Sequence, residues 1–154
     1  MSEMTLQYMA IIKLSIAVLY AVCYALGGMI RKWIRRFLAP LGIYLPGLVF
    51  LSLLNHSFNP WIVLSPFLLC VFLHLGYSDN EGWGWVKRLY IGAGFALSAL
   101  PIAFVTSNWL LFSIHSALCV GFMYSLGTYN PMNNARDEET MIGFMTVVIP
   151  IFMI

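Results

Sequence analysis

Three acidic residues stand in a row near the C-terminal end of the chain, where Asp137, Glu138 and Glu139 directly follow Arg136. Carboxylate oxygens are the ligands that Mg²⁺ and Ca²⁺ prefer, and arginines bind phosphate oxygens through paired hydrogen bonds. One chemistry that this pattern predicts is a divalent ion acting on a lipid phosphate. The candidate catalytic residues are Asp79, Glu138 and Glu139. The arginines that would hold the phosphate are Arg31, Arg35 and Arg136.

Two other interpretations of the same acids need no catalysis. In the first, Asp137, Glu138 and Glu139 form the cap and first turn of a last helix, where carboxylates meet free N–H groups and the positive end of the helix dipole. In the second, the acids pair with basic residues elsewhere in the chain. Helical spacing would place Arg31 and Arg35 on one face of a short basic segment.

The rest of the sequence gives little support for an enzyme. The acids match no common metal motif, and the hydrolase patterns Ser-x-x-Lys, His-Glu-x-x-His and Gly-x-Ser-x-Gly are absent. His74 and His115 differ in predicted depth by about 10 Å, too much for the two axial ligands of one haem. We therefore expect no cofactor and no resident metal, and the lipid-phosphate enzyme is kept as the alternative.

The composition is typical of a membrane protein. Of the 154 residues, 61% are hydrophobic and only 9% are charged, whereas about a quarter of the residues in soluble domains are charged. A net charge of +2 is too small to indicate nucleic-acid binding. The partners expected from the composition are the lipid bilayer and other membrane proteins.

Short polar breaks divide the chain into about six apolar stretches, each near the 20 residues that a transmembrane helix needs. Such short breaks leave no room for a soluble domain, so we predict one all-α domain over residues 1–154, a polytopic transmembrane helix bundle. The last span is short, and it is expected to cross the membrane only in part, to cross at a tilt, or to thin the bilayer locally. The predicted spans are roughly 7–29, 38–54, 60–76, 89–105, 109–127 and 140–154.

The basic residues predict how the bundle is oriented. Seven of the eight lie in the first, third and fifth connections, so these connections are expected to be cytoplasmic, in a bacterial-type cytoplasmic membrane. Five of the six acids share that side. Together they form a predicted charged cytoplasmic layer that suits anionic lipid headgroups or a protein partner. Its members are Arg31, Lys32, Arg35, Arg36, Asp79, Glu81, Lys87, Arg88, Arg136, Asp137, Glu138 and Glu139.

Small residues recur in the fourth and fifth predicted spans, at spacings that allow two helix backbones to approach closely. We expect the two rows to pack against each other as a hairpin, although the same rows would also suit an interface between copies of the chain. The row in the fourth span contains Gly92, Gly94, Ala96 and Ser98. The row in the fifth span contains Ser113, Ala117, Gly121 and Ser125.

These observations favour a non-catalytic function. We expect a small integral membrane protein that forms an oligomeric channel or pore, or serves as a subunit in membrane assembly. In either case the charged cytoplasmic layer would act as a gate or as a docking surface. A selective ion path usually needs polar groups at mid-membrane, and this chain has few of them, so several subunits would have to contribute.

Overall fold

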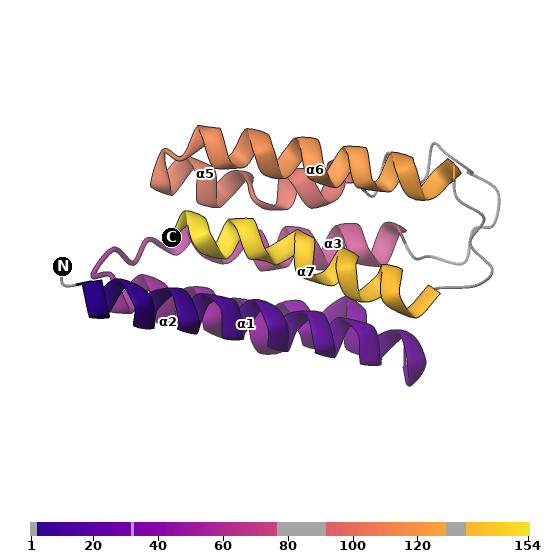
Figure 1. The fold of residues 1–154 in the computed structure, drawn as a ribbon, viewed down its shortest axis with the longest axis horizontal. Coiled ribbons are helices and arrows are strands. Elements are labelled where there is room, and N and C mark those ends of the chain that lie inside the picture. The colour runs from indigo at the N-terminus through magenta and orange to yellow at the C-terminus, as the bar shows by residue number, and fades with distance from the viewer. Residues whose placement is uncertain (1–2, 32, 77–91, 129–134) are drawn as a thin grey trace.

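The structure of the chain is a computed structural model that describes residues 3–31, 33–76, 92–128 and 135–154, and within these ranges the side chains except at 28–29, 76, 122, 124–128 and 135–142. Every regular element in these ranges is a helix (Figure 1). Residues 92–98 are also helical and lead into α5. The elements are α1 (Glu3–Met29), η1 (Ile34–Tyr44), α2 (Leu45–Leu54), η2 (Pro60–Val63), α3 (Leu64–Gly76), α5 (Leu100–Thr106), α6 (Trp109–Thr128) and α7 (Ala135–Met153).

The all-helical prediction is confirmed, and each predicted span contains helix. Two helical stretches, Glu3–Gly27 and Ile34–Leu54, are long and apolar enough to cross a membrane. Within the described residues, the other apolar helical stretches are shorter: Pro60–Leu75, Gly92–Thr106, Trp109–Gly121 and Gly143–Met153. The last helix begins at Ala135, earlier than the predicted start at residue 140, so its first turns carry the acidic residues.

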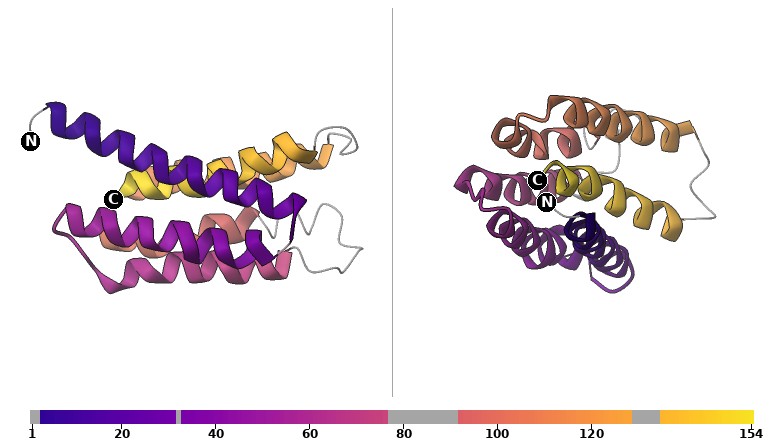
Figure 2. Two further views of the ribbon diagram at one scale, coloured as in Figure 1. Left: turned by 90° about the horizontal axis from the view of Figure 1, so that it is seen from below. Right: turned by 60° about the vertical axis from the view of Figure 1, so that its left-hand side comes forward.

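The helices form three layers, with α1 and α2 in the first, α3 and α7 in the second, and α5 and α6 in the third (Figure 1). The first and last helices pack against each other, and α7 also packs on α6. Successive spans of the chain run in opposite directions, where η1 and α2 count as one span and η2 and α3 as another. Both chain termini therefore lie at one end of the bundle (Figure 2). We call this the terminal end. The opposite end, where α1 ends and η1 and α7 begin, is the Arg35 end.

Prolines explain several of the local geometries. Pro40 has no N–H group, and η1 around it is a π-helix in which the amide of Leu45 donates to the carbonyl of Pro40, five residues earlier. Pro60 opens η2 at a position where its missing N–H costs nothing, and the side-chain oxygen of Asn59 caps this helix by accepting from the amide of Trp61 at 3.1 Å.

The core lies between the layers and is filled by large side chains. Tyr20, Tyr24, Tyr44, Leu48 and Leu69 are fully buried there. The outward faces of the helices also carry large apolar side chains, which would be unfavourable in water over so wide an area. Examples from four helices are Ile11, Leu19, Phe50, Phe67, Val71, Leu110 and Leu118, all of them exposed.

Glycine allows α1 and η1 to cross at the Arg35 end. A Cβ atom built on Gly27 would lie 2.5 Å from the backbone nitrogen of Arg35, so no side chain fits between the two backbones. A Cβ on Gly121 of α6 would have no neighbour within 4 Å. The two glycines therefore form a matched pair, one at a close contact and one in open space.

We predict that Gly27→Ala lowers the free energy of unfolding by about 1–3 kcal/mol, because the new methyl group pushes η1 away from α1. In Gly121→Ala, measured at protein concentrations low enough to keep copies of the chain apart, the better helix propensity of alanine should keep the stability or raise it by up to about 1 kcal/mol. Chemical unfolding in detergent micelles, followed by circular dichroism, measures both. Equal losses in the two variants would contradict the tight crossing.

Candidate functional site

The structure describes only some residues of the predicted charged layer. Arg31 lies in the connection after α1 and is exposed, whereas Arg35 lies inside η1 and is only 7% exposed. The prediction that they share one helix face is therefore wrong, because the helix that contains Arg35 begins after Arg31. Five members of the layer lie outside the described residues: Lys32, Asp79, Glu81, Lys87 and Arg88.

The acidic row lies at the start of α7. The helix begins at Ala135, so Asp137 is its third residue rather than its cap, and Glu138 completes the first turn. Carboxylates at these positions still favour the positive end of the helix dipole. The side chains of Arg136, Asp137, Glu138 and Glu139 are outside the described part, and so is all of Asp79. The catalytic alternative therefore stays a prediction.

Arg35 occupies a polar pocket between α1 and η1. Its Nε donates to the backbone carbonyl of Tyr24 at 3.2 Å, and its guanidinium carbon lies 4.7 Å from the centre of the Tyr24 ring. A hydrogen bond and a cation–π contact from one residue compensate much of the cost of burying the charge. The close approach at Gly27 brings the arginine near enough to reach Tyr24.

A cluster of tyrosines continues from Arg35 into the bundle. The rings of Tyr20 and Tyr24 are stacked with their centres 6.0 Å apart, and Tyr20 meets Tyr44 edge to face at 5.9 Å. The hydroxyl of Tyr44 shares a hydrogen bond with Ser65 of α3 at 3.1 Å. Aromatic pairs of this geometry stabilise beyond the area they bury. The cluster therefore links α1, η1 and α3 through fully buried side chains.

The start of α7 approaches the same cluster. A Cβ atom on Gly143 would lie 3.0 Å from side-chain atoms of Tyr24, so α7 rests directly on the tyrosine that holds Arg35. Glu139 stands four residues before Gly143, which is about 6 Å nearer the helix start at 1.5 Å per residue. Gly143 of α7 and the buried Arg35 thus both contact Tyr24.

The two rows of small residues in the predicted hairpin differ in burial. In the fourth span Gly92, Gly94, Ala96 and Ser98 are buried, and Gly94 packs against Phe72 of α3. In α6, however, Ser113, Ala117 and Gly121 are exposed. A Cβ atom on Gly92 would lie 3.0 Å from the backbone oxygen of Cys119 and 3.2 Å from the Met123 side chain of α6, so the two spans are in contact, but not through the row of small residues on α6. Ser125 lies among the side chains not described. A different face of α6 packs inward, through His115, Cys119 and Met123.

His115 stabilises a break in the fourth helical stretch. Just before Pro101 in α5, the amide of Ala99 donates to the carbonyl of Ala96 at 3.2 Å, three residues earlier. The carbonyl of Phe95 accepts from the hydroxyl of Ser98 at 2.7 Å and from Nε2 of His115 at 3.3 Å. Since a carbonyl only accepts, this contact places the ring proton on Nε2.

The thiol of Cys119 does not form a catalytic pair with His115. Its sulfur lies 3.7 Å from Nδ1 and 3.6 Å from Nε2. Nearly equal distances to both nitrogens place the sulfur over the face of the ring, away from the in-plane lone pair that a thiol proton would need. The contact is a sulfur–aromatic packing contact. Among the side chains that the structure describes, no three His, Cys, Asp or Glu groups gather around a metal-sized space.

Comparison with known proteins adds no relative: no family model, no curated protein and no solved structure matches the chain.

We predict that Arg35→Lys lowers the free energy of unfolding by about 2 kcal/mol, because lysine lacks the Nε–H donor and the planar group that lies on Tyr24. Arg31→Lys is the matched control and should change stability by less than about 0.5 kcal/mol, since Arg31 is exposed. Thermal unfolding in detergent measures both. A control as unstable as Arg35→Lys would show that the buried contacts of Arg35 with Tyr24 are not the cause of the loss.

Proposed function

We propose that the chain is an integral membrane protein built as a bundle of about six spans. Two helical stretches meet the length and hydropathy of a span. The alternating directions of the helices, with both termini at one end, suit a chain that crosses an even number of times (Figure 1). Large apolar side chains on the outward faces suit contact with lipid.

The Arg35 end is proposed to face the cytoplasm of a bacterial-type cell. Arg31, Arg35 and Arg36 lie at this end, and the acidic row begins α7 there. At the terminal end the exposed Trp61 and Trp109 open η2 and α6, at positions that suit the outer membrane interface. Lys13 of α1 lies with its amino group 5.6 Å from the centre of the Phe152 ring, near the C-terminus, consistent with a side chain that extends toward the outer surface.

The observation that carries the functional proposal is the exposed row of small residues on α6. Ser113, Ala117 and Gly121 share one face of this helix, and a Cβ on Gly121 would meet nothing within 4 Å. In lipid, helices associate where small residues allow close backbone contact. We therefore propose that the chain forms a homo-oligomer in which α6 of one copy packs against another copy.

The oligomer is proposed to act without catalysis, as a channel-type or assembly subunit. Fully buried tyrosine, leucine and alanine side chains fill the space between the helices of one copy, so an ion path would have to run between copies. The exposed Ser113 hydroxyl is one polar group that α6 offers to such a path. The charged layer at the Arg35 end would then gate the path or dock a protein or anionic lipid headgroups.

We predict that Ala117→Phe weakens self-association by at least about tenfold, because the ring keeps two α6 backbones apart. Val18→Phe places the same ring on the exposed face of α1 and should leave the oligomer intact. Light scattering of the purified protein in mild detergent, over a range of protein concentrations, gives the mass of each assembly. A parent that is monomeric throughout would reject the oligomer.

Ion permeation has a separate test. Induced expression should cause prompt potassium leakage and loss of membrane potential, and a variant in which Asp137, Glu138 and Glu139 become neutral amides should alter the leakage. Ala117→Phe at matched, verified expression should abolish it, because the path needs several copies. Tight membranes with the parent protein would reject permeation and leave membrane assembly as the function.

A further inference from the structure

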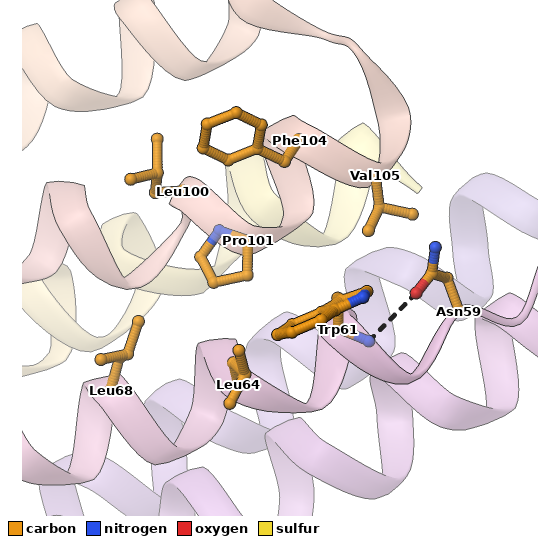
Figure 3. Close-up of a pocket in the computed structure, with 8 residues that line it drawn as sticks. All are labelled: Asn59, Trp61, Leu64, Leu68, Leu100, Pro101, Phe104 and Val105. Carbon is orange, nitrogen blue, oxygen red and sulfur yellow. Dashed lines mark hydrogen bonds between the residues drawn. The ribbon is translucent and has the colours of Figure 1, made fainter.

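An apolar groove lies on the outer surface of the bundle, between α3 and α5 at the terminal end (Figure 3). Its volume is about 480 Å³, inside the range of roughly 300–1,000 Å³ that is usual for small-molecule sites. Trp61, Leu64 and Leu68 form one wall, and Leu100, Phe104 and Val105 form the other. Pro101, near the start of α5, also lines the groove (Figure 3).

The groove changes in polarity along its length. Asn59 stands at the end nearest the connection between α2 and η2, and the other lining side chains are apolar or aromatic. The Asn59 oxygen accepts from the amide of Trp61 at 3.1 Å, and the amide nitrogen points to the opposite side (Figure 3). The Asn59 amide therefore places one hydrogen-bond donor at the end of an otherwise apolar groove.

The dimensions and the opening of the groove indicate what can enter. From Asn59 to Leu68 the chain rises roughly 15 Å, at about 2.0 Å per residue in η2 and 1.5 Å in α3. Trp61 and Phe104 are each 65% exposed, so the groove opens sideways onto the apolar outer face. A flexible hydrocarbon chain can slide in from that side, whereas a compact polar solute would lose its hydration.

We infer that this groove binds one acyl chain of a membrane phospholipid, with the ester carbonyl of the chain accepting a hydrogen bond from the Asn59 amide. The carbonyl is the acceptor that the Asn59 donor requires, and it lies at the interfacial depth that suits Trp61. The methylene groups run along Leu64 and Leu68 toward the bilayer centre. The inference rests on the proposed membrane location, and it adds a bound lipid that holds α5 against α3.

Two variants separate the parts of this site. Val105→Phe fills the groove from the α5 side. Asn59→Asp keeps an oxygen that caps η2 and removes the amide donor. Leu110→Phe adds a ring of the same kind on α6, at a side chain that is 73% exposed and outside the groove. Native mass spectrometry of protein released from mild detergent counts the phospholipids that each variant retains.

The parent and Leu110→Phe should each retain one phospholipid per chain, and Val105→Phe should retain none. Asn59→Asp should weaken retention roughly three- to tenfold, as expected for the loss of one hydrogen bond. Quenching of Trp61 by phospholipid with brominated acyl chains, measured against Trp61→Phe, places the chain in the groove. Retention by Val105→Phe equal to that of the parent, or a free fatty acid in place of the phospholipid, would overturn the inference.

A prior experiment keeps the two proposals apart. If alkaline carbonate releases the chain from membranes, the membrane location fails, and the proposed function and the lipid site fail with it. If the chain resists carbonate and the three variants retain lipid alike, only the lipid site fails. Circular dichroism of every variant confirms that the helices are intact before lipid is counted.

Discussion

A guanidinium group buried in a bundle of apolar helices must have its charge and its donors compensated where it lies, and the packing at the Arg35 end depends on this requirement. Tyr24 supplies both a carbonyl and a ring face to Arg35. Gly27 lets η1 come close enough for that contact, and Gly143 lets α7 rest on the other side of the same tyrosine. Three helices therefore meet where one charge has to be accommodated.

The same rule governs the neutral polar groups of the interior. Where a helical stretch is interrupted before Pro101, the carbonyl of Phe95 accepts hydrogen bonds from Ser98 and His115. Ser52 donates to the carbonyl of Leu48, and Tyr44 pairs with Ser65. Each buried hydroxyl or imidazole named here stands beside a backbone carbonyl or a second hydroxyl, as a medium without water requires. The polar residues of the core thus brace helix crossings and breaks.

Apolar stretches and their polar breaks predicted where the helices lie, because in this chain hydropathy alone separates helix from connection. Spacing could not predict that Arg35 is buried and Arg31 exposed, since a 3.6-residue period assumes one continuous helix and the chain turns between them. The small residues of α6 predicted close helix packing, but they did not indicate which helix would be the partner. Both faces of α6 are apolar, so the inward face was decided by the fit of His115, Cys119 and Met123. The groove beside Trp61 arises from three elements together and has no signature in any one of them.

The contact between the first and last helices has a consequence for how the molecule is made. The Tyr24 side chain can pack against Gly143 only after that glycine, more than a hundred residues later in the chain, has been synthesised. Until α7 has been synthesised, the face of Tyr24 that packs on Gly143 stays uncovered. Contacts so distant in sequence form late and slowly. A chain cut short before α7 would therefore leave that face of the tyrosine exposed, as incompletely folded chains expose apolar surface.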